Sequence, residues 1–226
     1  MLKLFRSFIL ACCLSLMAAT AFAAQVQVEP SVHPPQQDIT LPVVTVPDNP
    51  QASAAINAQI TKNIETFINQ SDECYKDNED WNKVYLGSSY TVTCNDGEIL
   101  SIVLAKYINV VHAAHPMHYT NGLNFNARTG EQIVEADLKE FSATKYGKNI
   151  YTPELLTDKL AKKAAESDEL IIFDGSLPLA ALPGQFYFDA DRHVHFLFQP
   201  YEIAPYVCGT IDVDMDTESD DYLTHR

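Results

Sequence analysis

The sequence predicts an α+β fold, in which a mainly antiparallel sheet packs with two principal helices in a single domain. Two separate segments carry apolar side chains at a helical period, and groups of segments rich in β-branched and aromatic residues lie between and after them. Short turn signals join several of these segments, as in antiparallel pairing. With 226 residues, 46% of them hydrophobic, the chain can bury one substantial core. These observations together favour the α+β class.

The first 23 residues are expected to be a secretory signal peptide. Lys3 and Arg6 precede an apolar run at residues 8–19, and the small residues Ala21 and Ala23 fit a signal peptidase site. The run is short for a membrane span, and no later run approaches the required length. We therefore expect cleavage after Ala23 and a mature protein that is periplasmic or secreted.

The mature chain is expected to begin with a proline-rich linker at residues 24–38, which the α+β domain follows at residues 39–216. An acidic tail, residues 217–226, ends the chain. Residues 39–46 are rich in β-branched side chains and predict a first strand. We place that strand at a sheet edge because Pro42 lies inside it.

The first helix is expected at residues 50–70. Asn49 and Pro50 suit its N-cap and its first helical position. One apolar stripe follows at helical spacing and consists of Ile56, Ile60, Ile64, Phe67 and Ile68. The second helix is expected to begin after Thr152, which suits an N-cap, and to end near Ser167.

Strands are expected at residues 83–94 and 98–111, which the turn signal Asn95-Asp96-Gly97 joins. Further strands are expected at residues 119–126, 132–135, 185–188, 193–199 and 211–215. In the last of these, aspartates alternate with apolar residues. The alternation predicts one buried face, with the aspartates exposed to water.

The charge of the chain restricts its partners. The formal net charge is −15, and loss of Lys3 and Arg6 with the signal peptide brings it to −17. An acidic protein repels nucleic acid and anionic membrane surfaces, so we expect neither as a partner. It attracts cationic partners. The simpler alternative is that the acidity only keeps an exported protein soluble.

Cysteine usage predicts one disulfide. Cys12 and Cys13 lie in the signal peptide, and the residues before Cys12 fit a lipoprotein signal poorly. Cys74, Cys94 and Cys208 remain, and three thiols cannot all pair within one chain. Because an oxidising compartment favours pairing, we expect a disulfide between Cys74 and Cys94, which are nearest in sequence.

Two patterns resemble metal sites only superficially. His112, His115 and His118 are spaced by three, but Pro116 breaks a helix there and no carboxylate or cysteine completes a zinc site. The run DVDMDTESDD begins like an EF-hand loop, but it lacks the glycine at position six and the glutamate at position twelve. We therefore expect no metal site and no cofactor.

The stretch FLFQPYEIAPYVCG, after the strand at 193–199, has the residue types of an interaction site. Its two prolines fix a bent backbone. Tyr201 and Tyr206 are large and amphipathic, which suits either a core edge or an interface. Glu202 between them either bonds to backbone or faces a partner. No serine, histidine or lysine lies close in sequence to form a nucleophile pair.

The same stretch resembles the final strands of the extracellular domain in RsiV-type anti-sigma factors and their exported relatives. The pattern there is an aromatic hairpin, then Tyr-Glu-Ile-Ala-Pro-Tyr, small residues and glycine; residues 201–206 and Gly209 match it. The turn Ala113-Ala114-His115-Pro116 is similar to a second motif of the family, with its first glycine replaced. Asn126, Thr129 and Gly130 match a third. The resemblance extends from about residue 39 to residue 215.

The resemblance implies a receptor-like role, because the best-understood domains of this kind bind lysozyme, a cationic muramidase. Others accompany a polysaccharide deacetylase domain. This chain has neither a sigma-binding segment nor deacetylase motifs, so we expect a free-standing exported domain.

We therefore expect a cell-envelope binding protein that senses or sequesters lysozyme or another cationic wall-active protein. His115, Tyr201, Glu202 and Tyr206 are the candidate partner-binding residues. The alternative is an enzyme of cell-wall or glycan metabolism in which His115 and Glu202 act as an acid/base pair. A structural envelope protein without a specific ligand is a third interpretation.

Overall fold

The structure is a computed structural model that describes residues 25–33, 38–75 and 84–216. These residues form one α+β domain with three antiparallel sheets and the α-helices α1 (Pro50–Tyr75), α2 (Leu138–Tyr146) and α3 (Pro153–Glu166). The predicted fold class is confirmed. The predicted signal peptide and acidic tail lie outside the described residues. In the described part, no helix is both long enough and apolar enough to cross a membrane.

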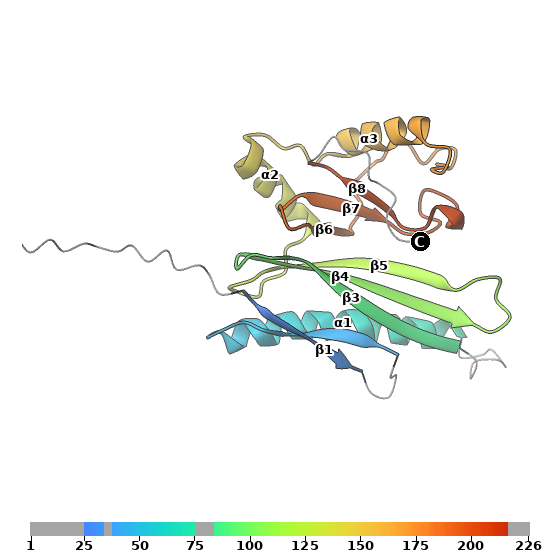
Figure 1. The fold of residues 1–226 in the computed structure, drawn as a ribbon. Coiled ribbons are helices and arrows are strands. Elements are labelled where there is room, and N and C mark those ends of the chain that lie inside the picture. The colour runs from blue at the N-terminus through green and yellow to red at the C-terminus, as the bar shows by residue number, and fades with distance from the viewer. Residues whose placement is uncertain (1–24, 34–37, 76–83, 217–226) are drawn as a thin grey trace, which may run out of the picture.

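The domain is built in layers (Figure 1). Helix α1 covers one face of a central sheet of β3 (Val84–Asn95), β4 (Ile99–Val110) and β5 (Met117–Asn126). The second sheet consists of β6 (Phe186–Phe188), β7 (Val194–Phe198) and β8 (Ile211–Asp214). It lies on the other side of the central sheet, and α2 and α3 lie beyond it. Every strand pair is antiparallel.

The amino-terminal part of the domain contains a strand, β1 (Gln27–Val32), in a segment that the sequence predicted to be linker only. Strand β1 pairs with β2 (Thr40–Thr45), so the linker prediction for residues 24–38 is wrong over β1. Pro30 lies directly opposite Pro42, so one position of the ladder carries both residues that lack an N–H. The side chain of Asn57 on α1 then bonds both the N–H and the C=O of Val44 at 2.8 Å.

Helix α1 and the central sheet enclose the first core. Asn49 caps the helix as predicted, because its Oδ1 accepts the Ala52 N–H at 3.0 Å. The predicted apolar stripe is buried against β4. The fully buried members of this contact are Ile56, Ile60 and Ile64 from α1, and Leu100, Ile102 and Leu104 from β4.

The second core lies between the second sheet and helices α2 and α3. Its aromatic members are Tyr151, Phe186, Phe188, Phe196 and Phe198, packed with Leu156 and Leu160 of α3. Thr152 caps α3 as predicted, with its Oγ1 accepting the Leu155 N–H at 3.2 Å. The strand predicted at 132–135 is absent. A single bridge from Gln132 to Phe125 is followed by the 3-10 helix η2 (Glu135–Asp137) and by α2, which the sequence did not predict.

A polar seam joins the two sheets. The Asn124 amide donates to the Phe186 carbonyl at 2.8 Å, and the Ser101 hydroxyl donates to the Asn124 side chain at 2.7 Å. The Phe188 N–H donates to the same hydroxyl at 3.0 Å. The backbones approach so closely that a Cβ at Gly122 would lie 1.7 Å from the Phe186 carbonyl oxygen. The seam therefore requires glycine at that position.

Two glutamines of the second half cap the free edge of β5. The Gln199 amide bonds both the N–H and the C=O of Thr120 at 2.8 Å. Gln185 Oε1 accepts from the Asn121 amide at 2.9 Å and from the Gly122 N–H at 3.2 Å. Side chains thereby satisfy an edge that would otherwise be open to pairing with another strand.

Candidate functional site

Three of the four predicted site residues meet at one end of the molecule, where the β4–β5 turn lies near the loop after β7 (Figure 1). His115, from that turn, stacks on Tyr206 with ring centroids 3.7 Å apart. His115 Nε2 lies 3.1 Å from the Tyr201 hydroxyl, and the two tyrosine rings are 5.7 Å apart. The Tyr206 hydroxyl donates to the Pro116 carbonyl at 2.6 Å. We call His115, Tyr201 and Tyr206 the aromatic corner.

The backbone of the corner is tightly constrained. Tyr201 has φ 69°, a left-handed conformation that costs a non-glycine residue about 1–3 kcal/mol. The buried residues Ile203 and Ala204 anchor the turn in the second core, and the Tyr201 N–H donates to the Ala204 carbonyl at 3.1 Å. Gly209, with φ 66° and ψ −154°, has a conformation that is essentially restricted to glycine. The 3-10 helix η3 (Tyr206–Cys208) lies between Ala204 and Gly209.

Glu202, the fourth predicted residue, stabilises the turn itself. Its Oε2 accepts the Gln199 N–H at 2.7 Å, and its own N–H donates to the Gln199 carbonyl at 3.0 Å. The ring nitrogens of His115 contact the Pro116 carbonyl and the Tyr201 hydroxyl. In the described part of the chain, His115 and Glu202 share no hydrogen bond, so no observation favours the acid/base alternative. No group of three His, Cys, Asp or Glu side chains in that part is placed so that it could hold a metal ion.

The expected disulfide between Cys74 and Cys94 is not formed in the structure. Cys74, Cys94 and Cys208 are all free thiols. Cys74 lies in the last turn of α1 and lines the pocket between that helix and the central sheet, whereas Cys94 lies on β3 and is paired with Ser101 of β4. Bridged cysteines have Cα atoms within about 7 Å of each other. Cys94 also packs in the second core, on the face of the sheet opposite to α1. Burial, and then the Asp96 carboxylate, raise the pKa of the Cys94 thiol to about 12.

Sequence reasoning missed a buried polar cluster in the second sheet. His195 Nδ1 lies 2.8 Å from Asp212 Oδ1, and the Tyr187 hydroxyl donates to Asp212 Oδ2 at 2.7 Å. The Tyr187 ring stacks on the imidazole with centroids 4.5 Å apart. Asp189 lies 3.6 Å from His195 Nε2, beyond hydrogen-bond distance. Burial would lower the pKa of His195, but Asp212, Asp214 and Asp189 together raise it.

The same cluster corrects the interpretation of the last strand. Asp212 is 6% exposed, and the Asp216 side chain is 1% exposed, so the carboxylates of both aspartates are buried. Asp216 accepts from the Tyr151 hydroxyl at 3.0 Å, from the Val194 N–H at 2.8 Å and from Lys145 Nζ at 3.0 Å. These contacts connect the end of β8 to β7 and α2. One signal in the sequence pointed to this cluster. Two histidines lie two positions apart at one strand, and aspartates lie two positions apart in the next strand.

Comparisons with known proteins agree with this division into two halves. Residues 35–118 match a family model described as the deacetylase PdaC, and residues 131–218 match one described as a protein of unknown function, DUF3298. The first model covers β2, α1, β3 and β4, and the second covers α2, α3 and the second sheet. The carboxyl-terminal half is therefore similar to DUF3298 domains.

Solved structures resemble the chain at low sequence identity. A DUF3298 family member from Bacteroides fragilis has a TM-score of 0.52 at 16% identity, with 85% of this chain and 90% of that chain covered. A DUF3298 family protein from Pseudomonas aeruginosa PAO1 has a TM-score of 0.46 at 14% identity, with 84% and 88% covered. The first likeness shows a shared fold. A comparison with curated protein sequences found no significant match.

Proposed function

We propose that the mature chain is an exported cell-envelope protein that binds lysozyme or another cationic wall-active protein through the aromatic corner. One observation carries this proposal: Tyr201 has left-handed backbone geometry, yet its side chain is 50% exposed. Strain of this kind is costly and is typical of functional positions. A tyrosine that only filled the core would gain more from burial.

The corner has the properties of a prearranged contact surface. His115 fixes the Tyr201 hydroxyl, and the stacked Tyr206 supports both rings, so little side-chain freedom remains to be lost on binding. Rigid, amphipathic tyrosines are frequent among the residues that dominate binding energy. Val207, 75% exposed, extends the apolar surface beside them.

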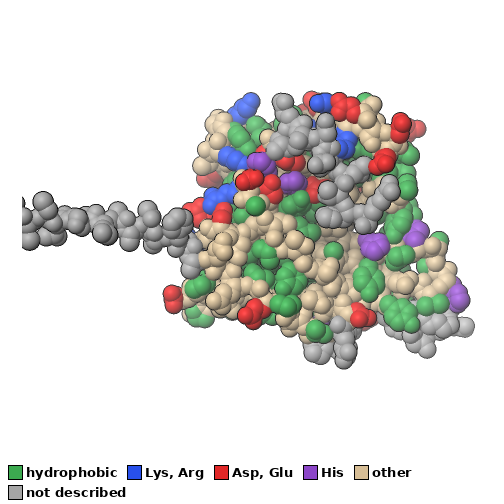
Figure 2. Space-filling model, viewed as in Figure 1, with side chains coloured by type: hydrophobic (Ala, Val, Ile, Leu, Met, Phe, Trp, Pro, Cys, Tyr) green, Lys and Arg blue, Asp and Glu red, His purple; other side chains and the backbone are tan. Residues whose placement is uncertain are grey.

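Charge supports a cationic partner. The chain has a formal net charge of −15, and in Figure 2 scattered carboxylates lie over the half that contains β1 and the central sheet. Most of the visible basic side chains lie over the other half, which contains α2 and α3. Such a field speeds the approach of a basic protein, and the corner would then hold it.

Surface plasmon resonance with immobilised mature protein and lysozymes from several sources tests this function. The association rate should fall as salt shortens the Debye length from about 30 Å at 0.01 M to about 8 Å at 0.15 M. Tyr201→Ala should raise the dissociation rate about 5- to 30-fold, as loss of a hot spot does. Tyr85→Ala is the matched control, because that ring is 53% exposed on β3, outside the corner. Absence of binding to every lysozyme at low salt would reject the proposal.

A further inference from the structure

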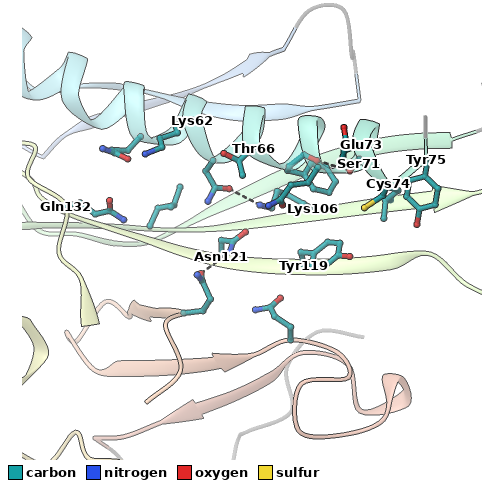
Figure 3. Close-up of a pocket in the computed structure, with 18 residues that line it drawn as sticks. Lys62, Thr66, Ser71, Glu73, Cys74, Tyr75, Lys106, Tyr119, Asn121 and Gln132 are labelled. Atoms are coloured by element: carbon teal, nitrogen blue, oxygen red, sulfur yellow. Dashed lines mark hydrogen bonds between the residues drawn. The ribbon is translucent and has the colours of Figure 1, made fainter. Parts of the chain in front are cut away.

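The second core, which anchors the aromatic corner, lies on one face of the central sheet. A second candidate site lies on the other face, which α1 covers. Helix α1, β4 and β5 enclose a pocket of about 810 Å³, and the capping glutamines Gln185 and Gln199 form part of its wall (Figure 3). This volume is in the range of small-molecule binding sites. Most of the lining residues have uncharged polar side chains, the rings of Phe67, Tyr75 and Tyr119 lie among them, and the charged residues are Lys62, Glu73 and Lys106.

A buried lysine lies at the pocket and has no carboxylate partner among the residues that the structure describes. Lys106 on β4 is 8% exposed, and its ammonium donates one hydrogen bond, to Asn63 Oδ1 at 2.8 Å. The ammonium also lies 5.2 Å from the centre of the Phe67 ring. Burial lowers the pKa of Lys106 to about 8, so the group is still largely protonated at neutral pH. An ammonium has three donors, and a buried charge is costly unless it is paired.

An unsatisfied acceptor lies on the same face of the sheet. Asn121 donates its amide to Gln185, but its Oδ1 is buried and has no hydrogen-bond partner within the described part of the chain. Tyr119, two positions before it on β5, is directly opposite Lys106 in the ladder. The Tyr119 and Phe67 rings meet edge to face, with centroids 6.2 Å apart. One patch of the pocket thus combines an unpaired cation, a free acceptor and aromatic surface.

We propose that this pocket binds a sugar acid, that is, a carbohydrate bearing a carboxylate, with the carboxylate on Lys106 and a hydroxyl donating to Asn121. A carboxylate supplies the partner that the ammonium lacks. The C–H face of a sugar ring suits the aromatic surface, and side-chain amides such as Gln59, Gln70 and Gln132 can both donate to and accept from its hydroxyls. A fatty acid would leave these amides unpaired, and a nucleotide would require more cationic groups.

Isothermal titration calorimetry tests the inference with trisaccharides of galacturonic, glucuronic and mannuronic acid, each beside its methyl ester. The ester keeps the rings and hydroxyls but removes the charge. We expect at least one acid to bind, and its ester to bind roughly 10- to 100-fold more weakly, as loss of a charge-assisted hydrogen bond implies. This comparison uses the unaltered protein, so it does not depend on how any variant folds.

Lys106→Met should abolish the difference between acid and ester, because the unbranched methionine side chain is uncharged and cannot pair with a carboxylate. Lys139→Met is the matched control, since Lys139 is exposed on α2 and outside the pocket. Equal binding of acid and ester by the unaltered protein would overturn the proposal, as would failure of every acid to bind at about 5 mM. Glutarate binding as tightly as the trisaccharides would overturn the assignment to a sugar. The site is independent of the proposed lysozyme contact, so either can fail alone.

Discussion

Replacing Lys106 with methionine should stabilise the protein at neutral pH, and the gain should vanish in alkali. Burial lowers the pKa of Lys106 from its ordinary 10.5 to about 8, and each pKa unit corresponds to about 1.4 kcal/mol. Holding the protonated ammonium in the fold therefore costs about 3 kcal/mol at pH 7. The lost hydrogen bond to Asn63 offsets about 1 kcal/mol of this. The net gain for Lys106→Met should be about 2 kcal/mol.

The sign of the pH dependence follows from proton binding. Below pH 8 both the folded and the unfolded states hold the Lys106 proton, so the cost is fully present. Between about pH 8 and 10.5 the folded state loses its proton first, and wild-type stability rises relative to the variant. Urea unfolding of both proteins at pH 7 and pH 10 measures this difference, and titrations common to both cancel. A variant less stable at pH 7, or a gain unchanged at pH 10, would refute the reasoning.

Three further outcomes are expected from other parts of the fold. Gly122→Ala should cost about 1–3 kcal/mol in urea unfolding, because the added Cβ would overlap the backbone of Phe186. A Cβ at Gly184 meets nothing within 4 Å, so Gly184→Ala should change stability by less than about 0.5 kcal/mol. Equal effects of the two substitutions would disprove the close approach of the two backbones at Gly122. His195→Phe should lose stability at pH 5 but much less at pH 9. The folded-state pKa of His195 is raised above its unfolded value of 6.5, so its protonation stabilises the fold fully below pH 6.5, and this stabilisation disappears as pH rises through the folded-state pKa. A loss of stability that does not depend on pH would contradict this. Ellman's reagent should label exposed Cys74 quickly and leave buried Cys94 unlabelled in the native protein, and peptide mass spectrometry without reductant should find no bridge between them; a bridged peptide would reinstate the disulfide.

The elements that could be predicted have strong local signals. Helix α1 carries seven buried residues, five of which form the predicted stripe, and Thr152 is a cap that can be identified from the sequence. Helix α2 buries only Leu138 and Ser142, so it has no apolar stripe to detect. Strand β1 was hidden by Pro30, since proline argues against a strand unless its ladder partner is known.

The two buried polar sites depend on contacts that no local pattern encodes. Alternation in β8 indicated that Asp212 faces water, but alternation cannot show that Tyr187 and His195 of the other strands in the sheet bury its carboxylate. Lys106 likewise lies in a β-rich run, where a lysine is normally exposed. The aromatic corner was accessible from sequence because its residues form a recognisable motif, although the stacking of His115 on Tyr206 joins positions far apart in the chain.

Hydrogen exchange of the mature protein, with and without saturating lysozyme, locates the partner surface without any substitution. The segments 112–120 and 199–210 supply the aromatic corner, and their amides lie in or beside turns that should exchange readily in the free protein. If lysozyme docks there, both segments should slow together while β3, on the far edge of the central sheet, stays unchanged. Slowing confined to α1 or β3, or no slowing anywhere under saturating conditions, would contradict binding at the corner.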